Sequence, residues 1–215
     1  MNVTNELLQS VLDKLRKEDL LALDTETTGL EETDRPFSFS IASELDTYNF
    51  DSRVITDLWS QSAPFFKEPR TYVLQNPKFD MRMLSYVGCF PTGKIYDLAV
   101  AARLVRNDHM SYSLAEQAKR AGMEKSKAVD EYIKKNKLYS VRRSNTGDSY
   151  KNPQFDQVPL EIISEYAGHD ARITFDLFKL YKSQLDSRAV EVMEHEAELT
   201  QVCYAMERRG VLLDR

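Results

Sequence analysis

Hydrophobic residues near the start of the chain change from helical to strand spacing. Leucine and valine at positions 7, 8, 11, 12 and 15 predict an amphipathic helix. The run LLALDTETTGL at 20–30 then predicts a strand that ends in a glycine turn. In RPFSFSIAS at 35–43 apolar residues alternate with serine, and TYNFD follows at 47–51 after a short acidic turn. These two segments predict a hairpin that continues antiparallel from the first strand.

Strands and helices alternate in the middle of the chain. RTYVLQ at 70–75 predicts a fourth strand, and KIYD at 94–97 predicts a short fifth one. Between them, NPKFDMRMLSYVG at 76–88 predicts a helix with Asn76 at its cap and Pro77 in its first turn. Three strands followed by strand–helix alternation are typical of an α/β fold, an α/β/α sandwich with a five-stranded mixed sheet.

Helices are expected in the rest of the chain. Asp97 is placed to cap one helix, and Ser113 with Glu116 forms a capping box for the next. Apolar residues recur at helical spacing through 159–185, and a last long helix is expected over 188–209. No internal repeat or low-complexity tract interrupts this order.

Composition excludes several classes of protein. A chain of 215 residues can build one sizeable core with an appendage, and its net charge of −5 excludes a basic protein that coats nucleic acid. Cys89 and Cys203 belong to no CxxC or Cys/His cluster, so neither a zinc site nor a disulfide framework is expected. No run approaches the roughly 18 apolar residues that span a membrane. We therefore expect a cytoplasmic protein without membrane contact.

The segment from 124 to 149 is polar and basic. Two interpretations remain open: a solvated helix and loop, or an electrostatic rim for a phosphate backbone, whose contacts would make binding salt-sensitive. The basic residues are Lys125, Lys127, Lys134, Lys135, Lys137, Arg142 and Arg143.

Two acids end the first predicted strand. Asp24 and Glu26 are two residues apart, so both side chains lie on the strand face that Ala22 shares. Two carboxylates about 4 Å apart repel by about 4 kcal/mol at a surface-like dielectric. A positive group is therefore expected between them.

Two further acids lie on predicted helices. Asp80 follows Asn76 by one helical turn, and as an isolated residue it would be an ordinary exposed acid. Asp170 lies inside an apolar stripe, with Tyr166 one turn earlier on the same face. A buried carboxylate there either pairs with an arginine or holds a metal ion. Four acids and a tyrosine favour a site of hard oxygen ligands for Mg²⁺ or Mn²⁺.

Three motifs, in order, resemble those of the DEDD 3′→5′ exonucleases, which belong to the ribonuclease H-like superfamily. They are LDTETTGL at 23–30, NPKFD at 76–80 and YAGHD at 166–170. The resemblance covers about residues 18 to 187. Tyr166 indicates the tyrosine form of the family, because the histidine form would have its base at the position of Glu165. His169 is expected to point off the face of Asp170, where it is structural or at most contacts the groups that hold the metal.

The resemblance implies two divalent metal ions and a role for each motif residue. Asp24, Glu26 and Asp170 would hold one ion, and Asp24 would also bridge to the second. Asp80 would contribute to metal binding through a water molecule. Tyr166 would orient the attacking water while the two ions stabilise the transition state.

The same resemblance implies how the substrate is held. Leu30 matches a leucine that wedges against the terminal base, although it could equally be a core residue. Asn76 matches an asparagine that contacts the last nucleotides, and Phe79 is expected to lie in the core rather than to serve as a stacking platform. The implied substrate is a single-stranded or frayed DNA 3′ end, from which nucleoside monophosphates are released one at a time.

The end of the chain resembles the junction at which family A DNA polymerases of bacteria and phages pass into their polymerase domain. ELTQVCYAMERRGVLLDR at 198–215 carries this likeness. We therefore divide the chain into an exonuclease domain at 1–187 and a junction segment at 188–215. The expected partner is a polymerase domain or subunit, and proofreading is the expected role.

Three rival functions share parts of this pattern. An RNA-trimming enzyme like ribonuclease D would carry the same motifs. An inactive exonuclease fold could serve as a scaffold or nucleic-acid-binding module, although loss of an acid would then be expected. An endonuclease of the ribonuclease H type would have the fold without reason to carry Tyr166.

Overall fold

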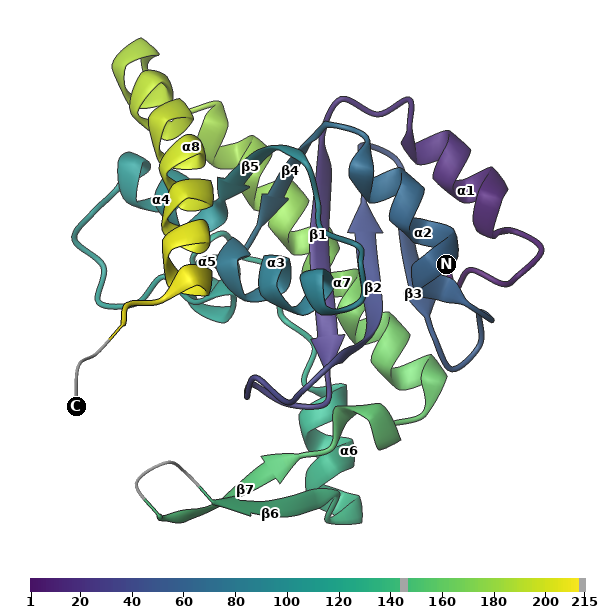
Figure 1. The fold of residues 1–215 in the computed structure, drawn as a ribbon. Helices are drawn as coiled ribbons and strands as arrows, with labels where there is room; N and C mark the ends of the chain where they lie inside the picture. The colour runs from purple at the N-terminus through teal and green to yellow at the C-terminus, as the bar shows by residue number, and fades with distance from the viewer. Residues whose placement is uncertain (144–146, 213–215) are drawn as a thin grey trace.

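A mixed sheet of five strands forms the centre of the protein (Figure 1). The computed structural model describes residues 1–143 and 147–212. The strands are β1 (Leu21–Thr27), β2 (Pro36–Ala42), β3 (Thr47–Asp51), β4 (Arg70–Leu74) and β5 (Gly93–Asp97). Their order is β3-β2-β1-β4-β5, with β1 antiparallel to β2 and parallel to β4. The predicted five strands and their mixed pairing are confirmed.

Three helices cover one face of this sheet. They are α1 (Leu8–Leu15), α2 (Leu58–Lys67) and α3 (Pro77–Tyr86). Their apolar residues pack with Leu21 and Leu23 of β1, and with Phe39 and Ile41 of β2, into one buried cluster. Burial of this apolar area is the main force that holds the layer to the sheet.

Four helices contribute to the buried cluster on the other face of the sheet. They are α4 (Leu98–Val105), α5 (Leu114–Arg120), α7 (Leu160–Lys182) and α8 (Ser187–Arg209). They share a second buried cluster with Ala22, Ala42 and Val73. The predicted α/β/α sandwich is therefore confirmed. Among the described helices, none is long and apolar enough to cross a membrane.

Strand alternation decides on which face each β1 side chain lies. Leu21 and Leu23 belong to the cluster with α1 to α3, whereas Ala22 belongs to the cluster with α7. The period of two therefore places Asp24 and Glu26 on the face of Ala22, as predicted, and α7 covers that face. The small residues Ser40 and Ser38 lie opposite them on β2. They leave room beside the carboxylates.

Two of the predicted helix caps are present. The Asp97 side chain accepts a hydrogen bond from the amide of Ala99, and the Ser113 hydroxyl accepts one from the amide of Glu116. Asn76 also lies at an N-cap position, but its side chain makes no capping bond. Its backbone is left-handed (φ 59°), a conformation that asparagine tolerates better than most residues.

The polar segment forms more structure than predicted. It contains α6 (Ala128–Asn136) and a hairpin of β6 (Tyr139–Arg143) and β7 (Ser149–Pro153), followed by the short helix η1 (Phe155–Gln157). Residues 144–146 of the predicted basic segment lie outside the described residues. The prediction of a helix followed by a loop is therefore wrong where the chain forms β6 and β7. The hairpin projects from the sheet next to the end of β1 (Figure 1).

The last helix packs against the body of the protein. Met193 and Ala197 of α8 are buried in the cluster on the α7 face, and Gln201 donates a hydrogen bond to the carbonyl of Gly93 on β5. Residues 213–215 of the predicted junction segment lie outside the described residues. Cys89 and Cys203 are both free thiols.

Candidate active site

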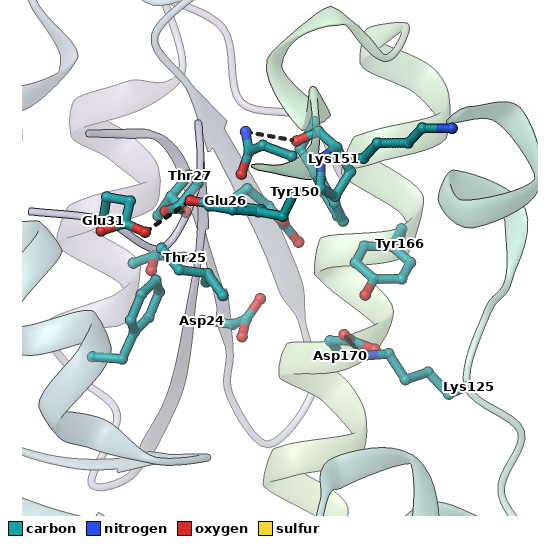
Figure 2. A pocket seen from close by; sticks show the side chains of 16 residues that line it. Asp24, Thr25, Glu26, Thr27, Glu31, Lys125, Tyr150, Lys151, Tyr166 and Asp170 are labelled. Carbon is teal, nitrogen blue, oxygen red and sulfur yellow. Dashed lines mark hydrogen bonds and ion pairs between the residues drawn. The ribbon is translucent and has the colours of Figure 1, made fainter. Parts of the chain in front are cut away.

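A cavity of about 550 Å³ opens at the end of β1. The wall is formed by β1 and the loop after it, by α7, and by residues of the β6–β7 hairpin (Figure 2). The lining includes Asp24, Glu26, Lys125, Tyr166 and Asp170. Three of the four predicted acids and the predicted tyrosine thus meet at one cavity, although they are far apart in the sequence.

Asp24 and Glu26 approach the cavity from β1. Glu26 is only 7% exposed, and Asp24 is partly exposed with its carboxylate directed into the cavity (Figure 2). The pairing with β2 shifts register between Glu26 and Thr27, where the strand ends. Burial raises the pKa of Glu26 to about 8, and repulsion from Asp170 adds to the shift. Burial and then the neighbouring carboxylates raise the pKa of Asp24 as well.

Asp170 approaches from α7 and is paired with a lysine. It is 4% exposed, and its Oδ2 lies 2.6 Å from Nζ of Lys125. One of the two predicted alternatives was that Asp170 pairs with an arginine. The partner is instead a lysine, Lys125, which also lines the cavity. The sequence predicted a positive group among these acids but did not identify it. The other oxygen of Asp170, Oδ1, is buried without a hydrogen-bond partner in the described structure.

Tyr166 lies one helical turn before Asp170, with its hydroxyl on the cavity side (Figure 2). The Nζ atom of Lys125 lies 5.0 Å from the centre of its ring. Burial, followed by repulsion from Asp170, raises the pKa of the phenol, so the hydroxyl keeps its proton at neutral pH. His169 does not line the cavity.

Asp80 lies behind the cavity wall. The carboxylate Oδ1 accepts hydrogen bonds from the Thr25 amide at 3.1 Å and from the Thr25 hydroxyl at 2.6 Å. At 4% exposure Asp80 is no ordinary surface acid. Burial raises its pKa to about 7. Through Thr25, which lies between Asp24 and Glu26, Asp80 is tied to the strand that carries both acids, but it does not line the cavity itself.

The three predicted substrate contacts fall at different places. Leu30 lines the cavity and is 74% exposed, so the core alternative is wrong. Phe79 is half-buried and lines the same cavity, so its expected place in the core is wrong too. Asn76 is exposed and lines a neighbouring hollow of about 310 Å³ instead. Phe79 lines both spaces and connects them.

The residues of the hairpin and of η1 that line the cavity were not predicted from the sequence. Tyr150, Asn152 and Phe155 lie in the cavity wall. No short-range signal identified them, because they reach the cavity only through contacts with residues far away in the sequence, such as the hydrogen bonds of Tyr150 to Glu31 and of Asn152 to Thr28.

The donor chemistry of the site fits a hard divalent cation. Asp24, Glu26 and Asp170 offer carboxylate oxygens, and the buried Oδ1 of Asp170 has no other partner in the described chain. As the side chains stand, no three Asp, Glu, His or Cys groups among the described residues are spaced to hold an ion. Lys125 supplies the positive charge to Asp170 instead. The three carboxylates would hold Mg²⁺ or Mn²⁺, which suit oxygen ligands.

Comparison with known families identifies the fold. The 3′-5′ exonuclease family matches residues 1–186. DNA polymerase I of Borreliella burgdorferi is 26% identical over 219 residues, which cover 97% of this chain and 22% of that protein. DNA polymerase DpoZ of Salmonella phage PMBT28 is 26% identical over 212 residues, covering 95% of this chain and 33% of that protein. The chain thus spans a third or less of these relatives.

Solved structures share the same architecture. The POL domain of Pol1 from M. smegmatis, in complex with DNA primer-template and dNTP, matches all of this chain and 33% of its own, with a TM-score of 0.73 and 17% identity. Escherichia coli RNase D, an exoribonuclease, matches 99% of this chain and 51% of its own, with a TM-score of 0.67 and 19% identity. These neighbours confirm the predicted ribonuclease H-like fold.

Proposed function

Because the chain belongs to the 3′-5′ exonuclease family, we propose that it removes nucleoside monophosphates one at a time from unpaired DNA 3′ ends, as a proofreading domain does. Family membership makes it a nuclease, and this family generally depends on divalent metal ions. The observation that carries the proposal is the meeting of Asp24, Glu26, Tyr166 and Asp170 at one cavity. An inactive scaffold would have no need of all four groups together.

We assign the metal ligands to three carboxylates. Asp24, Glu26 and Asp170 would hold Mg²⁺ or Mn²⁺, with two ions as the family resemblance implies, and Asp80 would support them from behind Thr25. When bound, such ions lower the pKa of a coordinated water and neutralise the charge that develops on the phosphate. The acidic cavity repels a phosphodiester until that charge is compensated.

The remaining groups orient the reactants. The protonated Tyr166 hydroxyl can donate to, or accept from, the attacking water beside Asp170. Leu30 and Phe79 provide apolar surface at the cavity for the terminal nucleoside, and Asn76 would contact the strand in the adjoining hollow. An unpaired end reaches these groups without the cost of breaking pairing and stacking, which favours frayed or single-stranded ends.

The polymerase relatives support DNA as the substrate. Two of them, from a bacterium and a phage, are DNA polymerases that extend well beyond the matched region. We propose that 1–187 is the exonuclease domain and that 188–215 is the start of a junction with a polymerase domain or subunit. This origin also fits a cytoplasmic location in a bacterial or phage-infected cell.

A second candidate is trimming of RNA 3′ ends. Structures of RNase D, including the Trypanosoma brucei enzyme with RNA U12 at a TM-score of 0.70, share the fold over 99% or more of this chain. The two candidates are separated by a competition between DNA and RNA oligonucleotides of one sequence, each labelled at its 5′ end. Faster loss of DNA, with nucleoside monophosphates as product, supports proofreading. Faster loss of RNA would replace it by RNA trimming.

A further inference from the structure

The β6–β7 hairpin grips the loop that follows β1. Arg142 on β6 forms two hydrogen bonds to Asp34, from Nη1 to Oδ2 at 2.6 Å and from Nη2 to Oδ1 at 2.8 Å. Asp34 is only 3% exposed and the Arg142 side chain is 28% exposed, so this pair is partly shielded from water. A two-point arginine–carboxylate contact fixes orientation as well as distance. The hairpin and the loop are thereby held in one relative position.

Two more side chains of the hairpin hold the same loop. The buried Asn152 donates from Nδ2 to the carbonyl of Thr28 at 3.0 Å, and Arg142 donates to that carbonyl at 3.3 Å. The Tyr150 hydroxyl donates to Glu31 at 2.7 Å (Figure 2). Strand alternation places Arg142, Tyr150 and Asn152 on one face of the hairpin, because Arg142 pairs with Tyr150 across the two strands.

Gly29 shows how closely the two segments meet. A Cβ at this position would lie 2.5 Å from Oδ2 of Asp34 and 2.9 Å from both Nη1 of Arg142 and Oδ1 of Asn152. No side chain fits there unless the ends of these three side chains move aside. The contact therefore leaves the loop little freedom.

The base of the hairpin is fixed to the helix that carries the catalytic groups. A small buried cluster joins Val129 and Ile133 of α6 to Phe37 of β2 and Ile163 of α7, with Tyr166 packed against it. The loop after β1 is thus connected, through the hairpin, to the helix of Tyr166 and Asp170.

Leu30 lies between the residues that the hairpin holds. The preceding residue, Gly29, lies close to the side chains of Arg142 and Asn152. The following residue, Glu31, accepts a hydrogen bond from Tyr150. The carbonyl of Leu30 itself accepts a hydrogen bond from Arg82 at 3.0 Å. Its side chain is exposed at the cavity although its backbone is held on both sides. Such a fixed apolar group meets an incoming chain end without rearranging.

We propose that Arg142 and Asn152 are positioning residues that hold Leu30 at the cavity and so make the site select unpaired 3′ ends. This proposal rests on the function proposed above. A paired end carries a second strand, which a fixed Leu30 excludes, whereas a single strand passes it. A loosened loop admits both kinds of end and binds each of them more weakly.

The first test replaces Arg142 by methionine. On a single-stranded oligonucleotide, KM is expected to rise by about tenfold with kcat changed much less, because the reacting groups stay in place while the substrate loop does not. The ratio of the rate on unpaired ends to that on paired ends is expected to fall by a similar factor. Tyr150→Phe, which removes the bond to Glu31 but leaves the two bonds from Arg142 to Asp34, is expected to act in the same direction more weakly.

The matched control is Arg106→Met. Arg106 also makes two hydrogen bonds to one aspartate, Asp108, but both side chains are exposed and neither lines the cavity. Unchanged kinetics are expected there. A fall in kcat of equal size on paired and unpaired ends in Arg142→Met, with KM and the ratio unchanged, would overturn the positioning role. The conservative Arg142→Lys is expected to recover part of the selectivity.

Amide hydrogen exchange tests, without any substrate, whether the hairpin holds the loop after β1 in place. In Arg142→Met the backbone amides of Glu31 and Asp34 are expected to exchange faster with solvent. The Glu31 amide donates a hydrogen bond to the Asp34 carboxylate that Arg142 holds, and the Asp34 amide donates to the Glu31 carbonyl in the same turn. Unchanged exchange would overturn the proposal. If the unaltered protein digests neither DNA nor RNA, the proposed function fails, and the exchange experiment alone decides whether the hairpin positions the loop.

Discussion

The ammonium group of Lys125 lies 2.6 Å from Oδ2 of Asp170, in the cavity that the carboxylates of Asp24 and Glu26 also line. Lys125 precedes α6, in the segment whose predicted roles were a solvated surface or a basic rim. Burial opposes its charge, but attraction to Asp170 and Tyr166 outweighs burial and raises its pKa. The lysine is therefore the counter-ion of the acidic cluster in this structure.

Replacing Lys125 by methionine tests this role. A divalent ion competes with the ammonium for Asp170, so removal of the competing charge is expected to tighten Mn²⁺ binding by at least about tenfold. The affinity is measured by calorimetric titration, with Lys127→Met as a control for loss of a positive charge close by. Equal or weaker binding by Lys125→Met would contradict the assignment of Lys125 as a counter-ion at the metal site.

The acidic cluster predicts how stability depends on pH without metal. The folded-state pKa of Glu26 is raised from 4.5 to about 8, and that of Asp80 from 3.8 to about 7. A raised carboxyl pKa means that the folded state holds its proton more tightly than the unfolded state, so stability is present at low pH and is lost as pH rises. In EDTA the melting temperature is expected to fall between about pH 5 and about pH 8. A rise over this range would contradict the account.

Glu26→Gln separates this repulsion from other effects of pH. The neutral amide removes one buried charge at nearly the same size, so the variant in EDTA is expected to melt about 3 °C or more above the unaltered protein near pH 8. Mg²⁺ is expected to stabilise the unaltered protein and to stabilise the variant much less. Glu165→Gln, at an exposed position of α7, serves as the control and is expected to change neither result.

Tyr166→Phe tests whether the hydroxyl orients the attacking water. The variant keeps the ring but loses the donor, so kcat is expected to fall by about tenfold to a hundredfold while Mn²⁺ affinity stays the same. Tyr132→Phe, in the same buried cluster but outside the cavity lining, is the matched control. A loss of metal affinity equal to the loss of rate would assign Tyr166 to metal binding instead.

The sequence predicted the sheet well because its signals are local. Alternation in β1 placed Asp24 and Glu26 on one face, and the caps at Asp97 and Ser113 depend on hydrogen bonds within a few residues. The helix α2 went unpredicted although its buried residues recur at helical spacing, because Pro64 lies inside it and a proline there argues against a helix. Periodicity alone does not identify such a helix.

The unpredicted parts of the site depend on distant contacts. The partner of Arg142 is Asp34, which is 108 residues away in the sequence, and the partner of Lys125 is Asp170. Neither pairing has a short-range signal. Phe79 looked like a core residue because it is apolar and next to a buried acid, but helix geometry directs it toward the cavity instead. The residue type alone does not predict which way a side chain on a helix points.

The exonuclease activity is best tested by digestion of a single-stranded DNA labelled at its 5′ end, with Mg²⁺ or Mn²⁺. We expect a ladder that shortens from the 3′ end, disappears with EDTA and is almost abolished in Asp24→Ala, while Leu30→Ala lowers the rate less. An intact oligonucleotide, from protein shown to be folded and to bind Mn²⁺, would contradict the exonuclease activity. Equal losses in the two variants would contradict the separate roles of Asp24 at the metal and Leu30 at the substrate.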